Sequence, residues 1–396
     1  MRDAFLLDPD LVFLNHGSFG ACPAEVFEVY QRWQREMERN PVEFLGRRSG
    51  ALLAQARQAF GAYLGAPADE LAFVPNATAG VNLVARSLAL QPGDEVLGTD
   101  LEYGACDAAW REICARQGAV YRRIEIPLPF ERESFVDRVC DAVTAHTRLI
   151  FASHITSATA LRLPIEDLCE AAHEMGVPTL IDGAHAPGQI PLDLTAIGAD
   201  YYTGNAHKWL CAPKGAAFVH VRPEHHTRLV PPVISWGYVA GADGARDDDE
   251  TVTGTTAGSF DELTGRSALQ RRLQWQGTRD IAAFLSIPAA IEFQARHDWP
   301  AQRARCHALA VETMHRALAR NGLAPIATDD DFVQMAAIPV RCTDGPALQR
   351  RLFDEHRIEV PVTQHGDTTM VRLSVQAYNT PAEAEALLGA LAALGV

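Results

Sequence analysis

Two patterns of apolar residues take turns through the middle of the chain: short continuous apolar runs, and longer stretches in which apolar residues recur with the period of a helix. Four short apolar runs are typical of buried strands, at residues 96–98, 149–152, 179–181 and 216–219. Between them lie amphipathic stretches such as residues 164–175, where apolar side chains recur on one helical face. This order of strands and helices predicts an α/β domain with a doubly wound, mostly parallel sheet.

The pattern changes toward the C-terminus. A helical region at 287–321 precedes strand candidates at 335–340 and 370–375, and Pro381 suits the first turn of a final helix. We therefore predict a large domain at 20–280 and a smaller α+β domain at 281–396, which also includes part of 1–19.

Residues 237–258 are rich in glycine and contain the acidic run 247–250. Glycine and clustered charge disfavour a packed core, so this stretch predicts a mobile surface loop between the domains. The sequence leaves open whether the loop closes over a site.

Charge and composition exclude several classes of function. The chain has 396 residues, 47% of them hydrophobic, and a formal net charge of −15, which disfavours binding to nucleic acid or anionic membranes. The N-terminus has no signal-peptide pattern, and no apolar run reaches the roughly 20 residues of a membrane span, so we expect a cytoplasmic protein. The eight cysteines have no spacing typical of disulfide frameworks or zinc sites.

Candidate chemistry lies at the ends of two predicted strands. An apolar strand ends in Asp182, within Asp182-Gly183-Ala184-His185, and a later strand ends in Asn205-Ala206-His207-Lys208-Trp209. In an open parallel sheet both stretches fall at the carboxyl edge, where ligands bind.

Asp182 and Lys208 meet two requirements of pyridoxal 5′-phosphate (PLP). The cofactor needs an amine for its aldehyde and an anion that keeps its pyridine nitrogen protonated. Lys208 supplies the first and Asp182 the second, and Lys208 can also move the substrate's α-proton. An aspartate that closes a strand is often only a cap, and a lysine beside a tryptophan is often a surface residue. The two together, in this order, favour the PLP interpretation.

These motifs resemble those of class V aminotransferase-fold enzymes. Together with Leu14-Asn15-His16-Gly17-Ser18-Phe19-Gly20, they are most similar to the isopenicillin N epimerase-like branch, and the resemblance covers nearly the whole chain. It implies PLP fold type I and an enzyme that acts at the α-carbon of an amino acid.

The resemblance also implies roles for other cofactor-binding residues. Ala77 and Thr78, at the start of a predicted helix, would hold the phosphate, since a helix N-terminus offers free N–H groups. Asn205 and His207 match other phosphate contacts. Tyr103 aligns with the aromatic residue that stacks on the pyridine ring. His185 aligns with the partner of the phenolic oxygen.

Arg372, within Val371-Arg372-Leu373-Ser374, resembles the arginine that binds the substrate's α-carboxylate. A guanidinium can bind a carboxylate through two parallel hydrogen bonds, which lysine cannot imitate. The motif at Leu14–Gly20 adds Asn15 and His16 as substrate-binding candidates.

Thr278, in Gln276-Gly277-Thr278, resembles an element that reaches the phosphate of a neighbouring subunit. That interpretation predicts a homodimer with shared active sites. The alternative is that Thr278 caps the following helix.

The reaction itself stays open between several outcomes. Residues 362–369 contain no cysteine where cysteine desulfurases of the family have their nucleophile, so persulfide chemistry is disfavoured, and Cys211 matches no such position. We expect epimerase-type proton transfer. The alternatives are a carbon–sulfur lyase on a cysteine derivative or sulfoxide, an aminotransferase, and a non-catalytic PLP-fold protein. For epimerisation, Tyr103, His16 or a water could carry the proton at the substrate face opposite Lys208.

In the turn at 157–160, where the branch usually has Pro and Gly, Thr156 or Ser157 could contact the cofactor.

Overall fold

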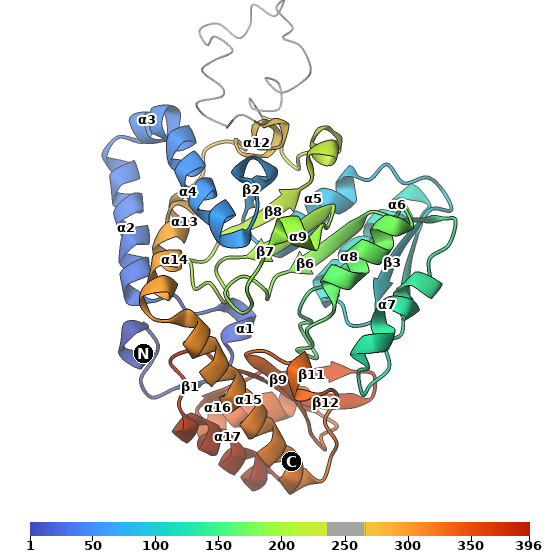
Figure 1. Cartoon of the computed structure of the whole chain (residues 1–396). Coiled ribbons are helices and arrows are strands. Elements are labelled where there is room, and N and C mark those ends of the chain that lie inside the picture. Colours follow the sequence, from blue (N-terminus) through green and yellow to red (C-terminus); the bar gives the residue numbers. More distant parts are fainter. Residues whose placement is uncertain (236–264, 266) are drawn as a thin grey trace, which may run out of the picture.

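The computed structural model describes residues 1–235, 265 and 267–396, and its largest element is a seven-stranded sheet (Figure 1). The strands lie in the spatial order β2-β8-β7-β6-β5-β3-β4. Their bounds are β2 (Leu71–Val74), β3 (Glu95–Thr99), β4 (Val120–Ile124), β5 (Thr147–Ser153), β6 (Thr179–Gly183), β7 (Tyr201–Asn205) and β8 (Ala217–Val221). All neighbouring strands are parallel except where β8 pairs with β2 and β7. The prediction of an α/β fold with a mostly parallel sheet is confirmed.

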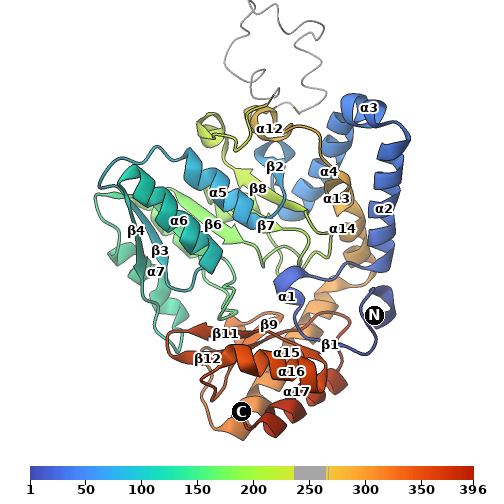
Figure 2. The same cartoon turned by 180° about the vertical axis from the view of Figure 1, so that it is seen from behind.

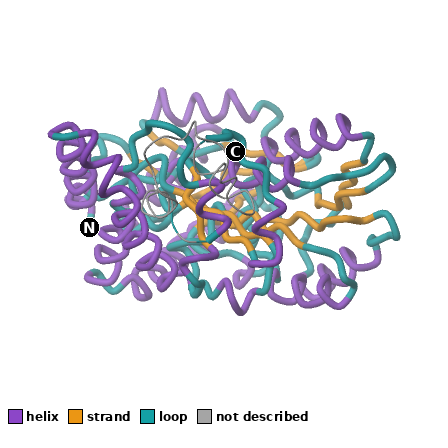
Figure 3. Tube along the Cα trace, turned by 90° about the horizontal axis from the view of Figure 1, so that it is seen from above, coloured by secondary structure: helices purple, strands orange, loops and turns teal. Residues whose placement is uncertain are grey.

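Helices cover both faces of this sheet. Helix α8 (Ile165–Glu174) and α9 (Leu194–Ile197) lie on the face seen in Figure 1, and α5 (Ala77–Ser87) and α6 (Gly104–Gln117) on the face seen in Figure 2. Figure 3 shows helices on both sides of the strands. Further helices surround these layers: α2 (Ala24–Arg39), α3 (Pro41–Glu43), α4 (Ser49–Leu64), α7 (Arg132–Asp141), α12 (Ala268–Leu273), α13 (Ala282–Leu285) and α14 (Ile287–Arg296).

Two hydrophobic cores result from the alternation of side chains along each strand. In β5, Ile150 belongs to one core and Phe151 to the other, because successive residues of a strand point to opposite faces. Phe151 packs against Trp110 of α6, with their ring centroids 5.7 Å apart. Burial on both faces explains why these strands are continuously apolar in the sequence.

A smaller antiparallel sheet lies below the large one in Figure 1, with the order β11-β12-β9. It comprises β9 (Met335–Pro339), β11 (Val362–His365) and β12 (Thr368–Ser374), and its helices are α15 (Trp299–Asn321), α16 (Gly345–His356) and α17 (Pro381–Leu394). The N-terminal segment joins this part of the molecule. Strand β1 (Val12–Phe13) pairs with β10 (Ile358–Glu359), and α1 (His16–Phe19) follows it.

The helical region expected at 287–321 is two helices. The chain breaks between α14 and α15, where Asp298 has a φ of 46° and its carboxylate caps the N–H of Ala301. The strands expected at 335–340 and 370–375 and the helix from Pro381 are present. The domain limits at 20–280 and 281–396 stay a prediction, and the loop expected at 237–258 lies outside the described residues.

Within the described ranges, the molecule has no helix with the length and apolarity that crossing a membrane requires.

Candidate active site

The predicted cofactor residues meet in one cavity at the carboxyl edge of the large sheet. The cavity has a volume of about 250 Å³. Eight of the predicted residues line it: Ala77, Thr78, Tyr103, Asp182, His185, Asn205, His207 and Lys208. They follow β2, β3, β6 and β7, whose ends lie at the same edge because these strands run parallel.

Lys208 lies in the loop after β7, with its amine facing His185. Its Nζ lies 3.2 Å from Nε2 of His185, and Nδ1 of His185 accepts a hydrogen bond from the Trp209 indole N–H at 3.2 Å. Burial, and after it the positive charge of Arg372, lower the pKa of Lys208 to about 8. Burial also holds the pKa of His185 well below 6.5, so its single N–H is on Nε2 and points at Lys208. This arrangement favours the neutral, nucleophilic amine.

Asp182 lies at the floor of the cavity, near the end of β6. It is only 3% exposed, and its carboxylate accepts hydrogen bonds from the N–H of Ala184 at 2.9 Å and the thiol of Cys106 at 3.5 Å. Burial raises its pKa, although the Ala184 N–H and the charge of Lys208 oppose that change. A buried carboxylate of this kind is stabilised by a cation placed beside it, which fits a protonated pyridine nitrogen.

Helix α5 begins at the other end of the cavity. Its Gly80 packs so tightly on β7 that an added Cβ would lie 2.1 Å from Oγ1 of Thr203, so only glycine permits this approach. Asn76 caps the N–H of Ala79 at 2.8 Å, and Asn205 accepts from the N–H of Ala77 at 2.9 Å. The N–H and hydroxyl of Thr78 have no partner among the described residues, so the helix terminus retains donors for an anion.

His207 completes this end of the cavity. Its Nδ1 lies 3.0 Å from the carbonyl oxygen of Ala216, and burial lowers its pKa to about 4. The ring is therefore neutral at pH 7, with Nδ1 as the donor, and a bound phosphate would favour its protonated form. The hydroxyl, amide and imidazole groups here suit a phosphate.

Arg372 extends from β12 of the small sheet toward Ser18 and Ser157, two residues that line the cavity. Its guanidinium donates to the carbonyl oxygen of Ser157 at 2.8 Å, to the hydroxyl of Ser18 at 3.1 Å and to Oδ1 of Asn15 at 3.4 Å. We call Asn15, Ser18, Ser157 and Arg372 the carboxylate clamp. Ser18 and Ser157 line the cavity, and the buried Arg372 lies behind them.

The guanidinium of the clamp has no carboxylate partner in the described part of the chain. Its Nε is buried and has no hydrogen-bond partner there, and burial lowers the pKa of Arg372 to about 10. A buried cation without a counter-ion is costly, so this group is suited to bind an anion.

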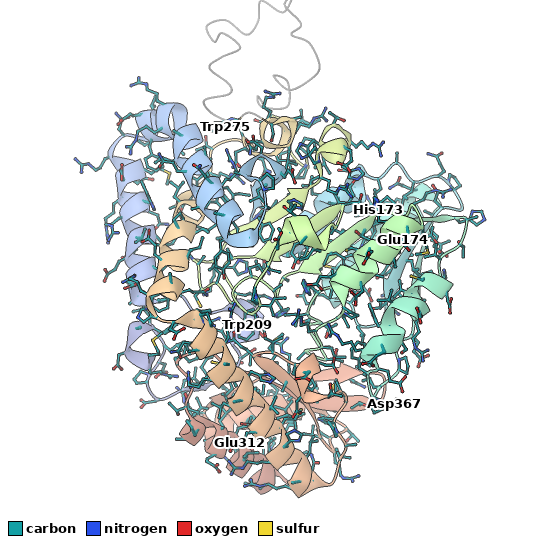
Figure 4. All side chains as sticks on the ribbon, viewed as in Figure 1. His173, Glu174, Trp209, Trp275, Glu312 and Asp367 are labelled. Carbon is teal, nitrogen blue, oxygen red and sulfur yellow. The ribbon has the colours of Figure 1, made fainter. Side chains whose placement is uncertain are left out.

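Four predicted residues are not among those that line the cavity: Asn15 and Arg372, whose contacts are given above, and His16 and Thr278. His16 is fully buried, with Nδ1 3.0 Å from the Tyr378 hydroxyl and Nε2 2.9 Å from the carbonyl oxygen of Lys208. It therefore supports the backbone at Lys208 from behind. Trp209, which follows Lys208 in the sequence, lies between the large and the small sheet in Figure 4. Thr278 is exposed in the segment before α13 and is not among the residues around the cavity.

Sequence reasoning missed Ser18, Phe19 and Ser153, which line the cavity, and Glu102, which Ser153 contacts. Ser153 ends β5 and donates to Glu102 at 2.6 Å, and burial raises the pKa of Glu102 to about 8. Ser18 and Phe19 lie within the motif at Leu14–Gly20, and Phe19 is 74% exposed at the cavity. Their positions in a motif or at a strand end were the only available signals. The chain also contains only two lysines, Lys208 and Lys214, which makes Lys208 a sharper candidate than its motif alone does.

Comparisons with known proteins point to one family. The model of the family Aminotransferase class-V matches residues 20–387. Isopenicillin N epimerase of Amycolatopsis lactamdurans is 39% identical over 98% of this chain and 96% of the relative, and that of Streptomyces clavuligerus is 36% identical over 99% and 97%. Putative L-cysteine desulfhydrase 2 of Oryza sativa subsp. japonica is 29% identical over 96% of this chain and 84% of its own.

Solved structures share the fold. The cystine C–S lyase C-DES, in complex with its product cysteine persulfide, has a TM-score of 0.79 at 22% identity, covering 97% of this chain and 98% of the other. A variant of C-DES with glycine linked covalently to its PLP cofactor has a TM-score of 0.80, also at 22% identity, over 97% of both chains.

Proposed function

The chain belongs to the class-V aminotransferase family, and on that premise we propose that it inverts the configuration at the α-carbon of an amino acid, with PLP as cofactor. One observation carries the proposal. Lys208 and Asp182 line one cavity together with Ser18 and Ser157, and these two serines contact the buried guanidinium of Arg372. These groups are suited to bind the cofactor, an α-amino acid's carboxylate and an α-proton.

The residues around the cavity fit the cofactor along its length. We assign Asp182 to the pyridine nitrogen, Tyr103 to the ring face, and His185 to the phenolic oxygen. The phosphate contacts are assigned to Thr78, the side-chain amide of Asn205 and His207, whereas the N–H of Ala77 is already bonded to Asn205. When bound, PLP supplies an electron sink next to the substrate's α-carbon.

Different residues of the protein bind the substrate and move its α-proton. Arg372 orients the substrate through its α-carboxylate, with Asn15 and Ser18 holding the guanidinium in place. Lys208, with its pKa lowered to about 8, accepts the α-proton. The N–H of His185 keeps the Lys208 amine directed into the cavity.

A carbon–sulfur lyase on a cysteine derivative is the second candidate. It is favoured by the similarity to putative L-cysteine desulfhydrase 2 of Oryza sativa subsp. japonica. Removal of the α-proton by Lys208 is the first step of both reactions. Elimination can follow it only if the β-carbon of the substrate bears a leaving group. No cysteine is among the described residues around the cavity, which disfavours a persulfide route.

Thr278 supports a homodimer as a further part of the proposal. It is exposed in this chain and lies apart from the chain's own cavity, as a residue that completes a partner's phosphate site would. The cytoplasmic location stays a prediction of the sequence.

Product analysis tests the proposed reaction. The purified holoenzyme is incubated with a panel of L-amino acids that includes cysteine, cystine and S-alkylcysteine sulfoxides, and the products are separated by chiral chromatography. A D-isomer supports epimerisation. Pyruvate with released sulfur compound and no D-isomer would replace the epimerase with the lyase, and a 2-oxo acid in step with consumed PLP would indicate transamination.

A further inference from the structure

An epimerase needs a second proton-carrying group on the side of the substrate opposite its first base. The strand order places Lys208 and Tyr103 at two flanks of the cavity. Lys208 follows β7 and Tyr103 follows β3, and β6 and β5 lie between these strands. Three strand spacings separate β7 from β3 by about 14 Å, yet both side chains line the same cavity. The residues therefore approach it from opposite sides.

The electrostatics of Arg372 connect the two flanks. Its positive charge lowers the pKa of Lys208, and an ionised Tyr103 would raise the pKa of Arg372. The guanidinium therefore lies within electrostatic reach of both side chains. A substrate carboxylate held by Arg372 would place the α-carbon, one bond away, between Lys208 and Tyr103.

The other candidate groups around the cavity have partners, lie on the side of Lys208 or, in the case of the Thr78 hydroxyl, are assigned to the phosphate. His185 contacts Lys208 itself, and His16 is buried away from the cavity. The remaining hydroxyl and imidazole groups with assigned contacts are Ser18 and Ser157 on Arg372, Ser153 on Glu102, and His207 on Ala216. The hydroxyl of Tyr103 has no hydrogen-bond partner within the described ranges, and the side chain is 46% exposed.

We propose that Tyr103 is the catalytic acid that delivers a proton to the face opposite Lys208, an inference that rests on the proposed epimerisation. A phenol is much more acidic than the serine and threonine hydroxyls nearby, so Tyr103 is the best proton donor among these groups. Ring stacking alone would make a phenylalanine sufficient at this position.

The proton transfers balance without any redox change. In the L-to-D direction, the α-C–H bond breaks and its proton moves to the Lys208 amine. The electron pair stays with the substrate and forms a new C–H bond on the opposite face, as the Tyr103 O–H bond breaks. Lys208 is left with one extra proton and Tyr103 with one fewer, and exchange with solvent restores both.

Tyr103→Phe tests the assignment, because it removes the acid and retains the ring. Tyr103 caps α6 without any side-chain hydrogen bond, so the variant keeps every cap contact of that helix. With the panel amino acid that reacts fastest, holoenzyme in D₂O is followed by ¹H NMR for loss of the α-proton and by chiral chromatography for the D-isomer. We expect the variant to exchange the α-proton with retention of the L configuration, while inversion falls by about 100-fold or more.

Two further measurements separate chemistry from structure. Binding of PLP to the apoenzyme, followed by absorbance titration, should be preserved in Tyr103→Phe and weakened in Tyr103→Leu, which loses the ring. Tyr30→Phe is the matched control, since Tyr30 of α2 lies outside the cavity and its hydroxyl meets Asp280 at 3.4 Å. This control should retain wild-type inversion.

Each outcome decides a separate point. Inversion that persists in Tyr103→Phe, or exchange and inversion lost by the same factor, would overturn the role of Tyr103. Exchange of the α-proton without inversion in the wild-type enzyme would also overturn the role of Tyr103. The protein would then be a PLP enzyme that catalyses a reaction other than epimerisation. No exchange with any panel member in the wild type would remove the proposed function itself.

Discussion

The two ends of the active-site cavity are built in different ways. At the cofactor end, Asp182 and Lys208 sit at the ends of adjacent parallel strands, 26 positions apart in the chain, and their partners come from the same loops. At the carboxylate clamp, Arg372 of the small sheet meets Asn15 and Ser157, which lie 357 and 215 positions away. The cofactor end thus depends on one sheet, whereas the clamp depends on the packing of three distant segments.

This difference implies that the two ends fail separately. Changes at the cofactor end should remove the chemistry and spare the clamp. Changes in the clamp should weaken the grip on substrate and spare the cofactor. Both ends share one electrostatic link, since the charge of Arg372 lowers the pKa of Lys208.

The largest effect is expected for Lys208→Ala. It removes both the amine that bonds to PLP and the base for the α-proton, so activity should fall by about 10⁴-fold or more. The imine absorbance expected at roughly 410–430 nm should change or vanish. Borohydride reduction followed by peptide mass spectrometry should label Lys208 alone in the wild type. Lys214→Arg is the control, and it should keep both band and activity. A label on Lys214 would refute the assignment.

Arg372→Ala should break the clamp while the cofactor end stays intact. The loss should cost about 2–5 kcal/mol of substrate binding, or roughly a 30- to 5,000-fold fall in kcat/KM. Arg372→Lys should rescue little of it, because an ammonium cannot form the paired hydrogen bonds. Absorbance titration with PLP should show normal cofactor binding. If both variants also fail to bind PLP, substrate binding at the clamp cannot be separated from cofactor binding at the other end of the cavity.

The pH dependence of cofactor capture should reveal the link between the ends. The pKa of Lys208 is lowered to about 8, so the reactive neutral amine increases as pH rises toward 8 and then levels off. The rate of PLP capture by the apoenzyme should rise about tenfold per pH unit below 8. Because Arg372 contributes to the lowered pKa, the midpoint in Arg372→Ala should move to higher pH. Stopped-flow absorbance measures both profiles, and an unshifted midpoint would argue against the link.

Ser18→Ala should give the smallest effect. It removes one of several hydrogen bonds that hold the guanidinium, so KM for the amino acid should rise by about fivefold, equivalent to about 1 kcal/mol. Steady-state kinetics on the panel substrate would show kcat nearly unchanged. A loss confined to kcat would mean that Ser18 acts on the reacting atoms instead.

The sequence by itself determined the sheet type and the cofactor end. Continuous apolar strands, helical periodicity between them, and polar residues where strands end are local patterns, and parallel strands bring such ends together without further information. That is why the residues from Ala77 to Lys208 that the motifs indicated line one cavity.

Only the tertiary structure decided the rest. It brought Ser18 and Ser157 to Arg372 across more than 200 positions, and buried His16 behind Lys208 rather than in the cavity. It also showed that Asn205 already occupies the N–H of Ala77. Contacts of this kind depend on how the small sheet and the N-terminal segment pack against the large one. Packing between distant segments leaves no periodic trace in the chain.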